Sequence, residues 1–252
     1  MADTGELFKG RSENYSKYRT VYPADILRIL NEKYMFNSRM TVADMGCGTG
    51  NLARLFLENG NPVYCLDPNE EMLQKARENL KEFSNATFLR GYAERSGLKD
   101  GSVNLVTAGQ SFHWFNTDKA KTEFKRILKG PNLVALIWNN REEDSATFNG
   151  EYERICRKYS PGYHGTGSSS ISEDLISDFF GWSHGYYQFD SSQDLDIEGI
   201  LGRYASASYS ISAGDPKYDA MVNEFKESFS AYEKNGKVRL KYTTKMFVGH
   251  LK

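Results

Sequence analysis

The segment that decides the fold is Val42-Ala43-Asp44-Met45-Gly46-Cys47-Gly48-Thr49-Gly50-Asn51-Leu52. The apolar run from Met40 to Met45 predicts a strand, and the spacing of apolar residues over 51–58 predicts an amphipathic helix closed by Gly60. Glycine at every second position between them lets the backbone turn tightly and approach a ligand closely. The segment therefore predicts a strand, a ligand-binding turn and a helix.

The alternation of strand and helix continues along the chain. Further strands are predicted at Val63–Asp67, Ala86–Gly91, Ser102–Gly109 and Asn132–Trp138, with helices at 70–81 and 117–128. After Trp138, helices are predicted at 152–158, 171–180, 195–207 and 218–232, and strands at 184–190 and 238–251, the last long enough for a sheet edge. This order predicts a doubly wound α/β fold with a seven-stranded, mostly parallel sheet, whose ligands lie at the carboxyl ends of the strands.

The chain is expected to form one domain over residues 1–252. Residues 1–39 form an amino-terminal arm and helix, and residues 40–140 form the ligand-binding core. Two helical stretches, 141–183 and 192–235, are expected to cover the mouth of the sheet as a cap, and segments 184–191 and 237–251 supply its last two strands.

Composition restricts the class of protein. The longest apolar run has six residues, 133–138, against the ~20 that a membrane-spanning helix requires, and the charged first residues do not resemble a secretory signal. A soluble cytoplasmic protein with no membrane partner is expected. The three cysteines lack C-x-x-C spacing, and His164 and His184 have no neighbouring ligands, so the cysteines are predicted to be reduced and no metal is expected.

Charge is evenly distributed. Residues 1–140 hold 19 basic and 16 acidic side chains, a balance of +3, and the remainder hold 13 and 17, a balance of −4. Binding of a nucleic-acid backbone needs a concentrated basic face, which neither half supplies in sequence. A small-molecule substrate is therefore expected, and no nucleic acid.

The spacing of the glycines restricts the class of ligand that the turn can bind. A dinucleotide-binding turn needs a third glycine at position 51, where Asn51 stands, and no Gly-Lys-Ser/Thr follows for a P-loop, which disfavours a nicotinamide oxidoreductase and excludes the P-loop. Asp67, at the end of the second strand, is placed to accept hydrogen bonds from both hydroxyls of a ribose. Asp44 favours a cationic ligand group beside the loop, such as an α-amino group or a sulfonium.

The motif 42–52, together with Asp67-Pro68-Asn69 and Met72, resembles the class I S-adenosylmethionine (SAM) methyltransferases, whose fold is Rossmann-like. FKGRSENYSKYRTVYP, GYAERSGL, QSFHWF and LGRYASASYS are similar to segments of a small-molecule branch related to trans-aconitate methyltransferase. The resemblance implies SAM as cofactor and S-adenosylhomocysteine as product. The turn Lys129-Gly130-Pro131-Asn132 departs from the Pro-Gly-Gly type of many relatives.

By position, the resemblance implies a set of cofactor-binding residues: Tyr15, Arg19, Asp44, Gly46, Cys47, Gly48, Gly50, Asp67, Pro68, Met72, Ala93, Glu94 and Gln110. The glycines would border the carboxypropyl group and ribose, Ala93 and Glu94 the adenine, and Gln110 the methionine portion. Arg19 would pair with the methionine carboxylate or with an acidic acceptor.

Candidate substrate residues are expected on four segments: Tyr22, His113, Trp114, Arg203, Tyr209 and Tyr242. Methyl transfer from a sulfonium is an in-line displacement that chiefly needs alignment, and a base is needed only if the acceptor must lose a proton. His113 is the candidate for that base, for a donor to the acceptor, or for a residue that supports the loop. A carboxylate or hydroxyl acceptor is preferred.

Two alternatives stay open from the sequence. A SAM-binding module without catalysis would carry the same cofactor motifs, and a nucleic-acid methyltransferase would need a basic surface. The sequence does not separate a monomer from a homodimer.

Overall fold

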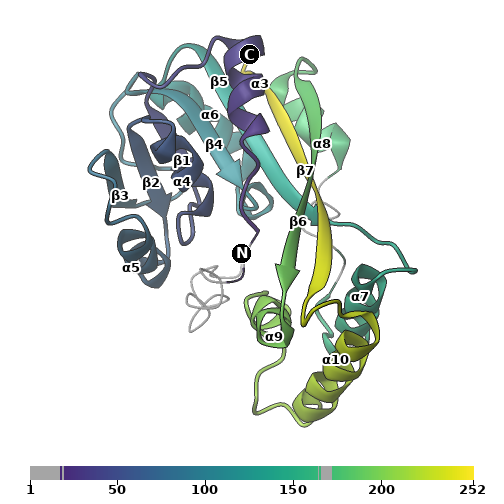
Figure 1. Ribbon diagram of the computed structural model, residues 1–252. Helices are drawn as coiled ribbons and strands as arrows, with labels where there is room; N and C mark the ends of the chain where they lie inside the picture. The colour runs from purple at the N-terminus through teal and green to yellow at the C-terminus, as the bar shows by residue number, and fades with distance from the viewer. Residues whose placement is uncertain (1–17, 19, 164, 166–171) are drawn as a thin grey trace.

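The computed structural model describes residues 18, 20–163, 165 and 172–252. Within this part of the chain, seven strands form one sheet in the order β3-β2-β1-β4-β5-β7-β6 (Figure 1). The strands are β1 (Val42–Met45), β2 (Val63–Asp67), β3 (Ala86–Arg90), β4 (Val103–Gly109), β5 (Leu128–Arg141), β6 (Gly185–Leu195) and β7 (Val238–His250). The helices are α3 (Asp25–Tyr34), α4 (Asn51–Glu58), α5 (Glu70–Asn79), α6 (Thr117–Ile127), α7 (Phe148–Tyr159), α8 (Glu173–Phe180), α9 (Ile197–Ala205) and α10 (Tyr218–Tyr232), with a short 3-10 turn η1 (Phe112–Trp114).

Five strands, β3 to β5 in the sheet order, are parallel, which confirms the mostly parallel α/β fold. β1 lies between β2 and β4, with Asp44 opposite Cys65 on one side and Thr107 on the other. The chain leaves β1 toward β2 and later returns to its other side as β4. Connections from these strands therefore diverge, and a crevice forms at their carboxyl ends.

Helices cover both faces of this sheet because parallel strands bury both of their faces. All four residues of β1 are buried. One hydrophobic cluster joins α3 and α4 to one face, and a second joins α6 and α8 to the other. The strands are thus held rigidly behind the glycine turn.

The antiparallel end of the sheet corrects one expectation. The strand predicted over 238–251 is not the edge, because β7 pairs antiparallel with β5 on one side and with β6 on the other. The edge is β6, which runs to Leu195 and pairs along the whole of β7. Residues 192–195, expected in the cap, therefore belong to the sheet.

β5 is longer than its predicted range of 132–138. The expected turn at 129–132 lies inside the strand, where Gly130 and Asn132 adopt φ of 61° and 54° and the register with β4 shifts. At its other end β5 continues past the last residue of β4 to Arg141, opposite Tyr242 of β7.

The later helices do not form a single cap. α7, α9 and α10 pack together around a separate hydrophobic cluster with one end of β7, below the sheet in Figure 1. We call these three helices the accessory cluster. α8, which was expected in the cap, instead packs against α6 and β7, where Ile176, Phe179 and Phe180 are buried. No described helix is both long enough and apolar enough to cross a membrane.

Candidate functional site

The glycine turn after β1 holds a conformation that side chains disfavour. Gly46, Gly48 and Gly50 have φ of 69°, 55° and 90°, the left-handed region in which glycine carries no Cβ penalty. A Cβ on Gly46 would lie 2.6 Å from Cβ of Ser111, which follows β4. The glycine turn and the β4 loop therefore approach more closely than any other residue would allow.

Asp67, the last residue of β2, holds the turn in place. Its Oδ2 accepts a hydrogen bond from the Gly48 N–H and its Oδ1 accepts one from the Asn69 N–H, both at 2.9 Å. The carboxyl group is 8% exposed, and burial raises its pKa to about 6, although the two backbone hydrogen bonds oppose that shift. Each carboxylate oxygen keeps a further lone pair for a ligand hydroxyl.

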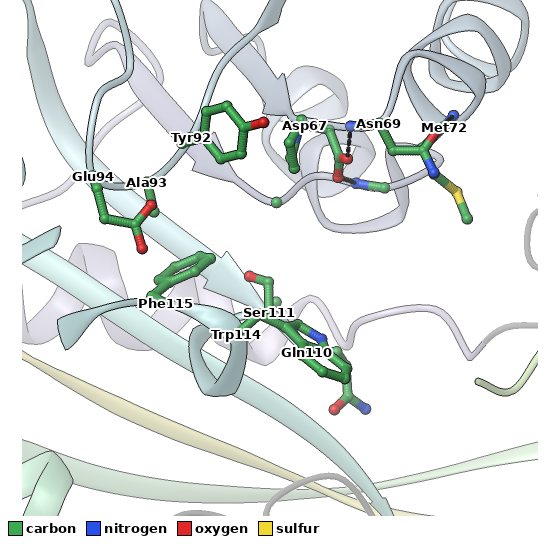
Figure 2. Close-up of a pocket in the computed structure, with 14 residues that line it drawn as sticks. Asp67, Asn69, Met72, Tyr92, Ala93, Glu94, Gln110, Ser111, Trp114 and Phe115 are labelled. Atoms are coloured by element: carbon green, nitrogen blue, oxygen red, sulfur yellow. Dashed lines mark hydrogen bonds between the residues drawn. The ribbon is translucent and has the colours of Figure 1, made fainter. Parts of the chain in front are cut away.

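A pocket opens between this turn and the β4 loop, and we call it the loop pocket. Figure 2 shows Asp67, Asn69 and Met72 on one side of it and Gln110, Ser111, Trp114 and Phe115 on the other. Its lining consists of Gly46, Gly48, Asp67, Pro68, Asn69, Met72, Tyr92, Ala93, Glu94, Gly109, Gln110, Ser111, Trp114 and Phe115. With its open mouth it encloses about 730 Å³, within the range of small-molecule sites.

Glu94 and Ser111 brace the walls of the loop pocket. The Asn116 N–H donates to Oε1 of Glu94 at 2.6 Å, which ties the segment after β3 to the start of α6. The Ser111 hydroxyl donates to the Met45 carbonyl at 2.7 Å. These bonds position the two loops before any ligand binds.

A second, more interior space adjoins the loop pocket, and we call it the arginine hollow. Its lining is Thr20, Tyr22, Asp44, Cys47, Asn51, Leu52, Gly109, Gln110, Asn139 and Arg203. Gly109 and Gln110 line both spaces, so the two adjoin at the end of β4. A Cβ on Gly109 would lie 2.6 Å from the Tyr22 hydroxyl, so glycine is required there.

Gln110 stands at this junction in a left-handed conformation with φ of 57°. Its backbone N–H donates to the Ile137 carbonyl at 2.9 Å, and its Nε2 donates to the Asn139 carbonyl at 2.8 Å. Both bonds are to β5, so the end of β5 determines where the Gln110 side chain lies.

Asp44 is fully buried at the base of the arginine hollow. Its Oδ1 accepts a hydrogen bond from the Thr107 hydroxyl at 2.9 Å, and its Oδ2 has no hydrogen-bond partner among the described residues. Burial raises the pKa of Asp44 to about 7, the Thr107 hydrogen bond opposes the shift, and the nearby Asp67 carboxylate adds to it. A buried carboxyl oxygen without a donor favours a cationic ligand group.

The structure brings most of the predicted site residues together. The loop pocket is lined by Gly46, Gly48, Asp67, Pro68, Met72, Ala93, Glu94, Gln110 and Trp114, and the arginine hollow by Tyr22, Asp44, Cys47 and Arg203. Contact with Cys65 and burial raise the pKa of the Cys47 thiol, so that group stays protonated.

Other predicted residues lie elsewhere. Gly50 lines neither space, since a Cβ there would lie 2.5 Å from Leu80 Cδ1, and its role is to pack α4 against α5. His113 packs against the Trp114 ring, at 4.7 Å between ring centroids, and lines neither space. Tyr209 and Tyr242 belong to the accessory cluster interior. Tyr15, Arg19 and His164 lie outside the described residues.

Several lining residues were missed by the sequence reasoning: Asn69, Tyr92, Ser111, Phe115, Thr20, Asn51, Leu52 and Asn139. Ser111 and Phe115 lie within the segment QSFHWF, so their position after β4 was a usable signal. The position of Asn139 could not be predicted in this way, because the predicted strand ended at Trp138. In the structure, pairing with β7 extends β5 beyond that residue.

A nucleoside that carries a cationic group fits this site. Asp67 has acceptor capacity left for two hydroxyls, the side chains of Met72, Ala93 and Phe115 supply apolar surface for a base, and Asp44 offers an unpartnered carboxyl oxygen. The residues present therefore fit SAM, whose sulfonium and amino group are cationic.

Comparison with known proteins agrees with this geometry. A family model described as a methyltransferase domain matches residues 43–135. An uncharacterized methyltransferase of Schizosaccharomyces pombe is 35% identical over 139 residues, which cover 55% of this chain and 54% of that protein. A second S. pombe protein, an uncharacterized methyltransferase-like one, is 26% identical over 98% of this chain and 97% of its own.

Solved structures show the same fold at low sequence identity. A SAM-dependent methyltransferase from Aquifex aeolicus superposes with a TM-score of 0.52 at 15% identity, over 94% of this chain and 97% of that one. The YcgJ protein of Bacillus subtilis gives a TM-score of 0.56 at 18% identity, over 91% and 98%. Residues 43–135 thus match a methyltransferase domain, an enzyme domain whose cofactor is S-adenosylmethionine, and the chain shares its fold with a solved SAM-dependent methyltransferase.

Proposed function

We propose that this protein transfers the methyl group of SAM to a small molecule and that the acceptor atom is an oxygen, a carboxylate in preference to a hydroxyl. The observation that carries the proposal is the lining of the two spaces: among their described residues there is no histidine and no lysine. A carboxylate is already deprotonated at neutral pH and needs no base, whereas a hydroxyl does.

The acidic side chains of the site are poor substitutes for that base. Both oxygens of Asp67 already accept backbone hydrogen bonds, and Glu94 is bonded to the Asn116 N–H. Asp44 is fully buried beneath the glycine turn. An acceptor that arrives as an anion avoids the need for any of them.

The size of the acceptor follows from burial. Most residues around the arginine hollow are shielded from solvent, among them Asn139, Leu52 and Arg203 at 7%, 3% and 6% exposure. The acceptor has to reach the methyl group beside this enclosed space, where Gly109 and Gln110 line both spaces, and a small molecule can do so where a polymer backbone cannot. This supports the expectation of a small-molecule substrate over a nucleic acid.

The chain promotes transfer mainly by alignment. Bound SAM supplies an electrophilic methyl group on a sulfonium whose positive charge disperses during an in-line displacement. Gln110, fixed by two hydrogen bonds to β5, and Gly109, against which the Tyr22 hydroxyl packs, form the surface between the two spaces. That surface orients the acceptor and keeps water from the reacting atoms.

The test uses SAM labelled in its methyl group and a panel of small carboxylic acids, matched hydroxyl compounds, DNA and RNA. A methylated carboxylate is an ester, so alkali releases its label as volatile methanol, whereas a methyl ether or methylated base keeps it. We expect alkali-labile label from at least one acid and none from the matched alcohols. The Asp67→Ala protein serves as the control with impaired cofactor binding.

Two results would count against the proposal. Alkali-stable label on hydroxyl compounds would reject the carboxylate acceptor, and label on DNA or RNA would reject a small molecule. SAM binding in calorimetry without transfer to any compound of the panel would favour the alternative of a non-catalytic SAM-binding module.

A further inference from the structure

Arg203 of α9 carries a buried positive charge with no acidic partner among the described residues. It is 6% exposed, its Nη1 donates a long 3.4 Å hydrogen bond to the Ser206 hydroxyl, and its Nε has no hydrogen-bond partner. A buried guanidinium that is neither paired nor fully hydrogen-bonded is costly, and the cost falls when an anion reaches it.

A second buried arginine nearby, Arg141, does have an acidic partner and serves as a comparison. Arg141 is also buried, but its Nε donates to Glu153 Oε1 at 2.6 Å, its Nη2 donates to the Tyr163 hydroxyl at 3.2 Å, and its Cζ lies 4.1 Å from the centroid of the Tyr152 ring. Glu153 therefore neutralises the charge of Arg141. The positive charge of Arg203 has no such acidic partner among the described residues.

Tyr152 and Tyr209, which lie near Arg203, do not supply that missing anion. Burial raises the pKa of Tyr209 to about 12 and raises that of Tyr152, so both stay neutral. For Tyr242, burial acts to raise the pKa, but the attraction of Arg203 and Arg141 outweighs it and the net shift is downward. Of these three tyrosines, Tyr242 is therefore the one that the two arginines draw toward its ionised form.

The arginine hollow carries a buried acid as well. Asp44 lines it together with Arg203, and Asp44 Oδ2 has no donor among the described residues. The hollow adjoins the loop pocket through Gly109 and Gln110. A ligand that fits both groups has an ammonium and a carboxylate on one short chain and is joined to a nucleoside.

We propose that Arg203 binds the carboxylate, and Asp44 the ammonium group, of the amino-acid end of SAM. A helix of the accessory cluster then completes the cofactor site, and Arg203 serves the cofactor instead of the acceptor. A simple acidic acceptor would match Arg203 alone, whereas the amino-acid end of SAM matches Arg203 and Asp44 together. The proposal rests on the cofactor and not on the acceptor chemistry proposed above.

The test is a binding cycle measured by calorimetry without turnover. Three ligands are compared: S-adenosylhomocysteine, its decarboxylated analogue, which keeps the amine, and 5′-methylthioadenosine, which lacks the whole amino acid. We expect Arg203→Met to weaken S-adenosylhomocysteine roughly 10- to 100-fold, the range for a hydrogen bond to a charged group. The same variant should leave the affinity for the other two ligands unchanged.

Matched variants locate the effect. Arg157→Met makes the same substitution at an exposed ion pair of α7 and should alter no affinity. Asp44→Asn should weaken both ligands that carry the amine and spare 5′-methylthioadenosine. Arg203→Lys, which keeps the charge but loses the planar fork of donors, should fall between wild type and Arg203→Met.

Clear results would overturn the proposal. If Arg203→Met binds S-adenosylhomocysteine as wild type does, the arginine does not contact the cofactor, and an acceptor anion is its remaining ligand. Loss of 5′-methylthioadenosine binding and of the circular dichroism signal would show that this variant does not fold. In that case the comparison of ligands on the wild-type protein tests the proposal. Equal wild-type affinity for S-adenosylhomocysteine and its decarboxylated analogue would exclude any anchor for the carboxylate.

Discussion

Replacing Asp44 with Asn should flatten the pH dependence of stability of the unliganded protein. Burial raises the pKa of Asp44 to about 7 from an ordinary 3.8, so between those values the folded state holds a proton that the unfolded state has released. Stability from this group is therefore fully present below about pH 4 and is lost as the pH rises to about 7 and beyond.

The size of the effect follows from that difference. At 1.36 kcal/mol per pKa unit, the group costs the folded state about 2 to 3 kcal/mol more at pH 8 than at pH 5. Asn keeps an oxygen to accept the hydrogen bond from the Thr107 hydroxyl but does not titrate. Between pH 5 and pH 8, the free energy of unfolding of Asp44→Asn should therefore fall by about 2 to 3 kcal/mol less than that of the wild-type protein.

The assay is urea unfolding followed by circular dichroism at pH 5 and pH 8. Asp174→Asn, at an exposed position of α8, is the matched control and should follow the wild-type pH dependence. Comparing each protein with itself at the two pH values removes the constant cost of burying the Asn amide. Parallel pH profiles for wild type and Asp44→Asn would refute the reasoning, since Asp44 would then titrate alike in the folded and unfolded chain.

Three further substitutions test the site and its support. Gly46→Ala places a Cβ 2.6 Å from Cβ of Ser111 at a φ of 69°, so it should lower the melting temperature and abolish S-adenosylhomocysteine binding; wild-type values for both in thermal shift and calorimetry would contradict the packing described. Asp67→Ala should weaken S-adenosylhomocysteine by roughly 1.5 to 3 kcal/mol because two ribose hydroxyls lose a charged acceptor. Unchanged affinity in calorimetry would mean that the ribose binds elsewhere. Glu153→Gln leaves the buried Arg141 without its counter-ion and should lower the free energy of unfolding by about 3 to 5 kcal/mol; a urea midpoint equal to wild type would show that the pair contributes no stability.

The parts of the site that were predictable are those that local sequence specifies. The glycine turn needs backbone conformations that only glycine adopts readily. Asp67 ends an apolar strand whose last residue can be recognised in the sequence. Both were therefore predicted correctly from the sequence as residues that line the site. Gly50 shows the limit of this reasoning, because its spacing matches the ligand glycines while its packing partner, Leu80, lies 30 residues away.

The arginine hollow was harder to predict from the sequence because pairing of distant strands builds it. Asn139 reaches the arginine hollow only since β7 extends β5 beyond β4. His113 was conspicuous in a motif after β4, but η1 turns it onto Trp114 and away from the lining of both spaces. The length of a strand and the direction of a side chain depend on contacts with residues far away in the sequence, which a local sequence pattern does not reveal.

The sequence by itself determined the order of strands and helices, the glycine turn and the acid that follows β2, because propensity, periodicity and backbone strain act over a few residues. Only the tertiary structure decided that β6 and not β7 is the edge strand, that α8 joins the core while α7, α9 and α10 pack apart from it, and that Asp44 and Arg203 border one hollow. The two residues of that pair are 159 positions apart. Burial of apolar surface and pairing of distant strands bring them together, and those forces depend on the whole chain at once.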